Sequence, residues 1–161
     1  MKTILILSAA LFSTFAQATP VVGDLVRYKM TTSVGPQNQI MEQRVEVTSV
    51  NPSAGTFTTK TTITFNGTTV SQESETADMN SATESESTLD HCSEMPADMA
   101  SIETITVPAG TFKVCHIKME QDGNKLDQYM GRVMFGLVKS VTTITAAHQT
   151  ITLELIEARK H

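Results

Sequence analysis

Cys115 and His116 stand side by side in the sequence, and a histidine next to a cysteine raises the question of a thiol nucleophile with its base. The surrounding run, residues 111–120, alternates like a β-strand, in which neighbouring side chains point to opposite faces. The two side chains are therefore not expected to meet. The other cysteine, Cys92, offers a disulfide instead, which an exported chain favours. We predict a Cys92–Cys115 bridge, whose closed loop of about 24 residues is worth roughly 3.4 kcal/mol in the chain-entropy model.

His91, Met95 and Met99 form a second group of side chains with ligand chemistry. Soft thioether sulfur suits Cu(I), so the group is a copper candidate in an exported protein. A loop gives such ligands no fixed geometry, however. We interpret the two methionines as residues that cover apolar surface beneath a loop, as flexible methionine often does.

Glu120, Asp122, Asn124 and Asp127 carry oxygen atoms of the kind that calcium prefers. Their run, EQDGNKLD, lacks the spacing of a complete calcium loop, and Asp-Gly-Asn is already explained as a hairpin turn. We therefore predict a turn at this place, and no metal or other cofactor for the protein.

The remaining signals of catalysis are weak. The four histidines, at positions 91, 116, 148 and 161, are scattered over a predicted loop, a strand, a turn and the last residue. The sequence contains no Gly-x-Ser-x-Gly elbow, no His-Glu-x-x-His motif and no glycine-rich phosphate loop. We predict that the protein is not an enzyme. A site assembled only in space stays open as a less favoured alternative.

The first 18 residues predict export. Lys2 precedes an apolar run, residues 4–15, that is too short to span a bilayer, and AQA at 16–18 is a small-residue cleavage site. The residue after the expected cut is Thr19, which cannot accept the lipid anchor that a cysteine would. We expect a protein without a membrane anchor, either in the periplasm of a bacterium or secreted.

The chain that remains after the expected cut, residues 19–161, has the size of one ordinary domain. Loss of Lys2 changes its formal charge from −5 to −6. An acidic protein is repelled by phosphate backbones, so nucleic acid is excluded as a natural partner, and anionic membrane surfaces are disfavoured for the same reason.

Period-two alternation runs through most of the chain and predicts strands with one buried face. Val26, Tyr28 and Met30 share one face of an early strand, and Phe57, Ile63 and Phe65 share one face of a later one. We count about nine such strands, joined mostly by short turns. The sequence predicts an all-β fold: a curved antiparallel sheet or half-open barrel, with no amphipathic helix of ordinary length.

Residues 71–103 interrupt this alternation and contain nine acidic side chains. Such a composition buries too little apolar surface to order itself, so we predict a mobile acidic loop over 71–101. Cys92 would tie the end of this loop to the strand of Cys115. A single helical turn is expected at 96–101, because Pro96 is tolerated in a first position.

A motif in the second half carries a resemblance to a known family. VPAGTF at 107–112, Cys115, GLVK at 136–139 and a closing TLELIE strand resemble a group of secreted bacterial β-domains of unknown function, some of them called TapB-like. The resemblance implies a curved antiparallel sheet, similar to periplasmic lipoprotein carriers that hold acyl chains in a half-open barrel. It implies no reaction.

Taken together, the sequence predicts an exported, non-catalytic β-domain that binds a lipid-like ligand or an envelope protein on a sheet face. A sheet has two faces, and no predicted helix covers the second. The alternative is a structural or interaction module of the envelope that uses the acidic loop or an edge strand. The residues expected to line a ligand site are Tyr28, Met30, Phe57, Phe65, Phe112, Met119, Met130, Met134 and Phe135.

Overall fold

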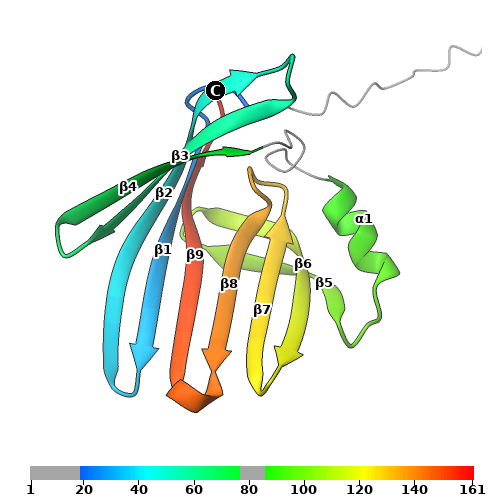
Figure 1. Ribbon diagram of the computed structural model, residues 1–161. Coiled ribbons are helices and arrows are strands. Elements are labelled where there is room, and N and C mark those ends of the chain that lie inside the picture. Colours follow the sequence, from blue (N-terminus) through cyan, green and yellow to red (C-terminus); the bar gives the residue numbers. More distant parts are fainter. Residues whose placement is uncertain (1–18, 77–85) are drawn as a thin grey trace, which may run out of the picture.

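A computed structural model describes residues 19–76 and 86–161, and the expected signal peptide lies outside these ranges. Nine strands form one antiparallel sheet, in the order β4-β3-β2-β1-β9-β8-β7-β6-β5 (Figure 1). The strands are β1 (Leu25–Val34), β2 (Gln37–Asn51), β3 (Thr56–Phe65), β4 (Thr68–Thr76), β5 (Ala100–Val107), β6 (Gly110–Gln121), β7 (Asn124–Gly131), β8 (Leu137–Ile144) and β9 (Gln149–Arg159). One α-helix, α1 (Glu86–Glu94), and a short 3-10 turn, η2 (Thr145–Ala147), complete the described elements.

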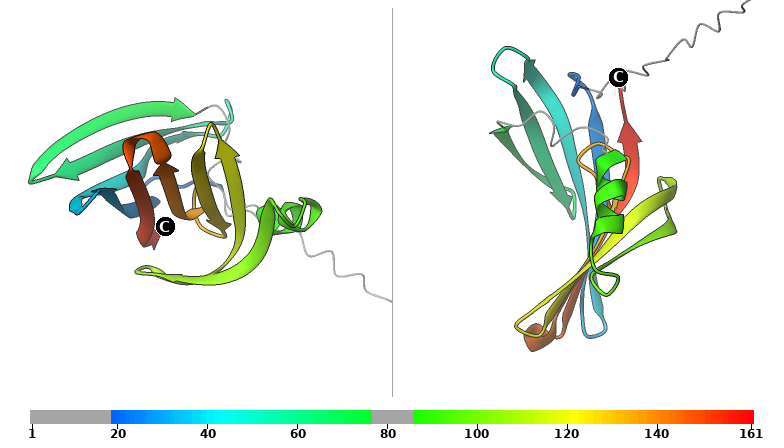
Figure 2. Two further views of the ribbon diagram at one scale, coloured as in Figure 1. Left: turned by 90° about the horizontal axis from the view of Figure 1, so that it is seen from below. Right: turned by 90° about the vertical axis from the view of Figure 1, so that its right-hand side faces the viewer.

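The first and last strands pair with each other in the middle of the sheet. The register runs from Leu25 opposite Arg159 to Val34 opposite Gln149. Two meanders, β1 to β4 and β5 to β9, are thereby joined into one surface, with β4 and β5 as its two edges. The sheet twists and curls without closing (Figure 2). The prediction of an all-β, curved and open antiparallel sheet is confirmed.

The short turns have the conformation that their residues require. Asn66 and Gly67 have φ values of 47° and 78°, and Asp122 and Gly123 have 53° and 75°. Two successive positive φ values are characteristic of the tight type I′ turn, whose twist matches that of the strands it joins. These hairpins follow from local sequence.

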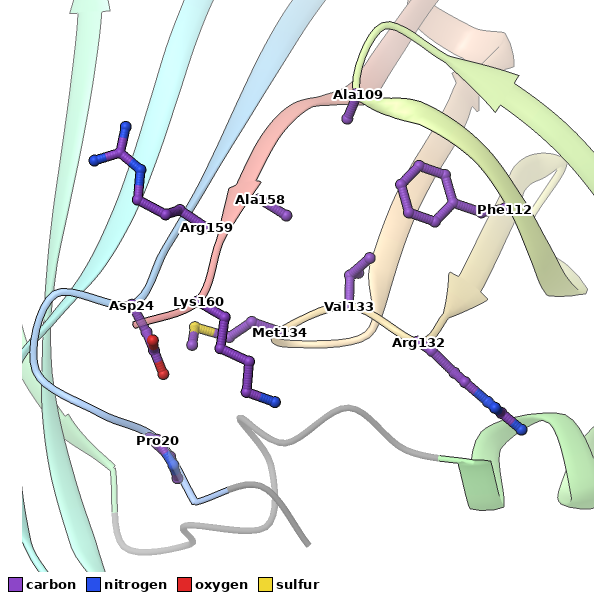
Figure 3. A pocket seen from close by; sticks show the side chains of 10 residues that line it. All are labelled: Pro20, Asp24, Ala109, Phe112, Arg132, Val133, Met134, Ala158, Arg159 and Lys160. Atoms are coloured by element: carbon purple, nitrogen blue, oxygen red, sulfur yellow. The ribbon is translucent and has the colours of Figure 1, made fainter.

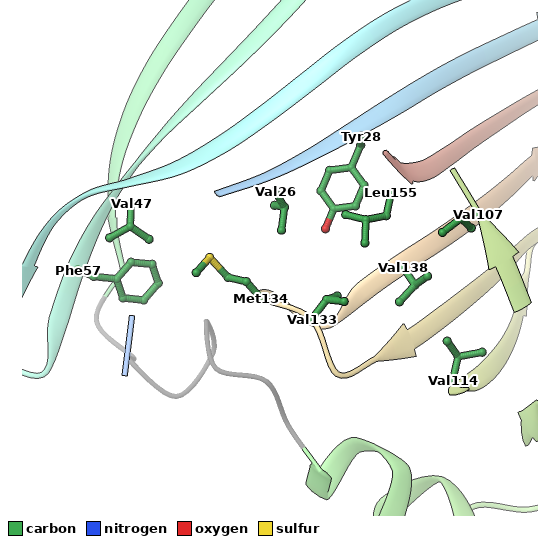
Figure 4. Packing of buried hydrophobic residues seen from close by; sticks show 10 residues of the cluster. All are labelled: Val26, Tyr28, Val47, Phe57, Val107, Val114, Val133, Met134, Val138 and Leu155. Atoms are coloured by element: carbon green, nitrogen blue, oxygen red, sulfur yellow. The ribbon is translucent and has the colours of Figure 1, made fainter. Parts of the chain in front are cut away.

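The main core lies where the β7–β8 connection, residues 132–136, folds in between the curled halves of the sheet (Figure 4). Val133 and Met134 from this connection pack among side chains of the surrounding strands. The Tyr28 hydroxyl donates a hydrogen bond to the Leu137 carbonyl oxygen at 3.0 Å, which ties β1 to the start of β8. The buried members of the cluster are Val26, Tyr28, Val47, Phe57, Val107, Val114, Val133, Met134, Val138 and Leu155.

The prediction of a mobile acidic loop over 71–101 includes residues 77–85, which lie outside the described ranges, and the structure differs from it on either side of them. Residues 71–76 belong to β4, residues 86–94 form α1, and β5 begins at residue 100. The helix buries Leu89 and Cys92 in a second, smaller cluster with Ala100, Cys115 and Ile117. Leu89 and Cys92 are the two described side chains of α1 in this contact. Because the segment around them is rich in acidic residues, its composition did not predict an ordered helix.

The expected turn after α1 is present, with the amides of Met99 and Ala100 donating to the Pro96 carbonyl oxygen at 2.9 and 3.0 Å. Within the described ranges, no helix has the length and apolar character needed to cross a lipid bilayer.

Candidate ligand-binding sites

The Cys115–His116 pair is divided between two environments. The sulfur atoms of Cys115 and Cys92 lie 2.10 Å apart, at bonding distance, and join β6 to α1. The His116 ring stacks on Tyr129 with ring centroids 4.2 Å apart. A thiol nucleophile with a histidine base is therefore absent from this part of the described chain, and alternation along β6 is the reason.

His116 instead links three strands. Its Nδ1 lies 2.8 Å from a Glu103 carboxylate oxygen on β5, and its Nε2 lies 2.7 Å from a carboxylate oxygen of Asp127 on β7. Partial burial, together with the negative charges of Asp127 and Glu103, raises the pKa of Tyr129. The sequence analysis missed this cluster, because its members are far apart in sequence and only the β5-β6-β7 register aligns them.

One face of the sheet is charged, and its ionic groups neutralise one another. Lys139 on β8 and Glu154 on β9 form an ion pair at 3.0 Å. Arg27 on β1 reaches Glu42 at 3.0 Å and Glu157 at 2.8 Å. A single row of cross-strand partners follows this charged face through six strands: His116, Tyr129, Lys139, Glu154, Lys29 and Glu42.

The opposite face, called the apolar face below, has few ionic groups. Its parallel row of partners is Ile117, Gln128, Ser140, Leu153, Met30 and Met41. The helix α1 packs against β5, β6 and β7, and no other helix of the described ranges lies over β9, β1 and β2 in the middle of this face (Figure 1). Partly buried apolar side chains are therefore open to a ligand there.

A groove of about 360 Å³ lies on the apolar face. Its lining combines apolar side chains with the Tyr28 hydroxyl, which already donates its hydrogen bond to the Leu137 carbonyl oxygen. Burial raises the pKa of Tyr28, so this side chain is neutral. The residues of this face groove are Tyr28, Gln43, Val45, Phe57, Thr59, Phe135, Leu137 and Leu153.

A separate pocket of about 240 Å³ lies at the end of the core (Figure 3). It forms where the tip of the β5–β6 hairpin, the β7–β8 connection, the end of β9 and the start of the described chain converge. The Ala109 amide donates to the Leu155 carbonyl oxygen at 3.1 Å and holds the hairpin tip in place. The residues of this end pocket are Pro20, Asp24, Ala109, Phe112, Arg132, Val133, Met134, Ala158, Arg159 and Lys160.

The residues predicted to line a ligand site separate into three groups. Tyr28, Phe57 and Phe135 line the face groove. Phe112 and Met134 line the end pocket. The others line neither of these sites: Met30, Phe65, Met119 and Met130.

The sequence analysis missed other lining residues. Val45 and Leu153 lie on alternating strands, so their face was predictable although their partners were not. Val133 lies in an irregular connection, where alternation carries no information.

The proposed copper ligands have other surroundings. His91 Nδ1 lies 3.1 Å from a Glu94 carboxylate oxygen within α1. Met95 and Met99 are 38% and 47% exposed. Among residues 19–76 and 86–161, no group of three or more histidine, cysteine or acidic side chains is arranged to hold a metal ion.

Comparison with known proteins finds the fold but no family. No protein-family model and no curated protein matches the chain. A solved protein of Bacteroides fragilis, described as "a putative exported protein with YmcC-like fold", superposes with a TM-score of 0.57 at 11% identity, over 88% of this chain and 98% of that one. A "putative lipoprotein" of Parabacteroides distasonis superposes with a TM-score of 0.54 at 16% identity, over 88% and 97%. The fold is thus shared with one protein described as exported and one described as a lipoprotein, while the TapB-like resemblance stays a prediction.

Proposed function

We propose that the protein is an exported, non-catalytic β-domain that binds an apolar, lipid-like ligand in the face groove. The observation that carries this proposal is the difference between the two faces of one open sheet. The charged face satisfies its own side chains with ion pairs. The apolar face has a groove of about 360 Å³, and within residues 19–76 and 86–161 no helix packs over its middle strands.

The lining of the groove favours binding over catalysis. Apolar and aromatic walls with a few polar groups are typical of small-molecule sites, and pockets of about 300–1,000 Å³ are usual for them. The polar groups here are Gln43, Thr59 and Tyr28, and none of them is a carboxylate, a thiol or an imidazole. Such a lining can exclude water from an apolar group and orient it, and the groove places no carboxylate, thiol or imidazole beside its hydroxyls to activate them.

The decisive experiment has two stages. Native mass spectrometry of protein purified from its own envelope should show a retained apolar molecule. A fluorescent fatty-acid probe should then bind the wild type, and Leu153→Gln should weaken binding about tenfold by placing an amide in the groove. The matched control is Thr152→Gln, which introduces the same side chain one residue away on the opposite face. Equal binding by the two variants would reject the groove as the site.

A second candidate function rests on β4. This edge strand has exposed side chains at residues 68–74 and no proline or lysine, the residues that commonly protect an edge from pairing. A partner protein could add a strand there. Ser71 lies opposite Thr62 in a non-hydrogen-bonded pair of this hairpin. The backbone N–H and C=O of Ser71 therefore point away from β3, toward the open edge of the sheet. Ser71→Pro should therefore abolish co-purification of the partner protein while leaving the β3–β4 pairing intact. If the partner still co-purified, the edge of β4 would be excluded as its binding site.

A further inference from the structure

We propose that the end pocket is a second binding site, for a small amphiphile with one anionic head group and a short apolar chain. The end pocket and the face groove have no lining residue in common, so the two sites can be tested independently. Its volume of about 240 Å³ is below the range usual for drug-sized ligands, which limits the apolar part to a short chain.

The walls of the end pocket are apolar and fixed. Val133 and Met134 are 4% and 8% exposed, so the rest of the core holds them. Phe112 closes one side, and Ala109 beside it is held by its hydrogen bond to Leu155. Burial of these apolar side chains against a ligand is therefore favourable, and binding costs little side-chain conformational entropy because they are already held in place.

The charge around the pocket is positive, in contrast to the net charge of the chain. Three of the lining side chains are cations and one is a carboxylate, that of Asp24. Asp24 is completely buried, and its oxygens already accept hydrogen bonds from the amides of Val21 at 2.8 Å and His161 at 2.7 Å. Its demand for donors is thus partly met by these two backbone amides.

The three cations are not equivalent. In the view of Figure 3 the Lys160 side chain lies between Met134 and Pro20, whereas the Arg132 and Arg159 side chains extend outward from the other lining residues. Arg159 is held by Glu157 at 2.7 Å. Lys160 need not be unpaired for this role, because a lysine that has another partner still places a positive charge at the pocket. Lys160 is therefore the residue assigned to the anionic head group, above apolar walls that take its chain.

The chemistry of this assignment predicts a preference among three ligands of equal chain length. Octanoate, 1-octanol and octylammonium share one apolar part and differ in head-group charge. At low salt, calorimetry should show octanoate binding about tenfold more tightly than 1-octanol, and octylammonium binding least, because coulombic attraction adds to apolar burial. Equal binding of octanoate and 1-octanol would overturn the assignment.

Two pairs of variants locate the site. Lys160→Met should remove the preference for octanoate and retain 1-octanol, whereas Lys125→Met, a lysine in the β6–β7 hairpin that lines no part of the end pocket, should change neither. Ala158→Phe should fill the pocket and abolish binding of both ligands, whereas Ala147→Phe in η2 should not. Persistence of the octanoate preference in Lys160→Met would reject the role of that lysine. If Leu153→Gln lost octanoate binding and Ala158→Phe kept it in full, the ligand would lie in the face groove and the end pocket would be rejected as its site.

A measurement on the wild type keeps the test decisive if a variant fails to fold. Octanoate added to protein with labelled alanine methyl groups should shift the methyl resonances of Ala109 and Ala158, which line the pocket. The resonance of Ala147, in η2 at the other end of β9 from Ala158, should not move. Shifts confined to other alanines would reject the site.

Discussion

The backbone amide of Ala109 donates to the carbonyl oxygen of Leu155 across 3.1 Å, although their strands are not neighbours in the sheet. Ala109 lies in the turn between β5 and β6, while β9 pairs with β1 and β8. This hydrogen bond thus joins a hairpin at one edge of the sheet to its centre. Ala109, which it holds against β9, is also one of the residues that line the end pocket.

The amide of Ala109 should accordingly exchange slowly with solvent for a residue in a turn. Hydrogen exchange followed by NMR should find it protected to a degree similar to the amides of β6, because it opens only when the hairpin leaves β9. The amide of Gly67, at the tip of the exposed β3–β4 turn, is the comparison and should exchange quickly. Equally fast exchange of the two amides would show that the hairpin tip is free in solution.

The Cys92–Cys115 bridge should be complete in exported protein and should stabilise the fold. Alkylation under non-reducing conditions should find no free thiol by mass spectrometry. Replacement of both cysteines by alanine should lower the free energy of unfolding by about 3 kcal/mol and the Tm by roughly 10 °C, because the unfolded chain loses a constraint and α1 loses its tether. Two alkylated cysteines, or an unchanged Tm in the double variant, would contradict a structural role.

Tyr28 should make stability fall at alkaline pH. Burial raises its pKa in the folded state, so the folded protein keeps a proton that the unfolded chain releases above about pH 10. The stabilisation is complete below the unfolded pKa and is lost as the pH rises toward the folded pKa.

Tyr28→Phe should cost about 1 kcal/mol at pH 7, through loss of the hydrogen bond to Leu137, and should flatten the decline in urea-unfolding free energy above pH 10. Tyr129→Phe, at a less buried tyrosine, should flatten it less. An equally steep decline in Tyr28→Phe and the wild type would exclude Tyr28 as its source.

Gly131 should not tolerate a side chain. A Cβ atom at this position would lie 2.9 Å from Val138 Cγ2 and 3.2 Å from Val114 Cγ1, and both valines are completely buried. Gly131→Ala should therefore destabilise the protein by about 1–3 kcal/mol in urea unfolding. Val138→Ala makes room for the new methyl group, so the double variant should be more stable than the sum of the two single effects predicts. Strict additivity would show that the contact does not exist in solution.

Local chemistry made much of the fold predictable. Alternation placed Val26, Tyr28 and Phe57 on inward faces, where all three are buried. Asn66-Gly67 marked a tight turn that has the expected positive φ values. These features depend on neighbouring residues, so composition and periodicity were sufficient. The helix α1 was not predictable in this way, because two buried residues, Leu89 and Cys92, give only a weak signal in an acidic run.

The pairing of β1 with β9 and the curl of the sheet were decided only by the tertiary structure. The first and last strands become neighbours through contacts across more than 110 residues, and no short window of sequence contains that information. The same holds for Glu103, His116 and Asp127, which only the strand register brings together, and for the end pocket, whose walls come from four separate segments. The sequence by itself determined strands, turns and the cysteines available for a bridge, because these depend on local backbone preference. The sites depend on which distant surfaces come to face each other, and that is settled by long-range packing.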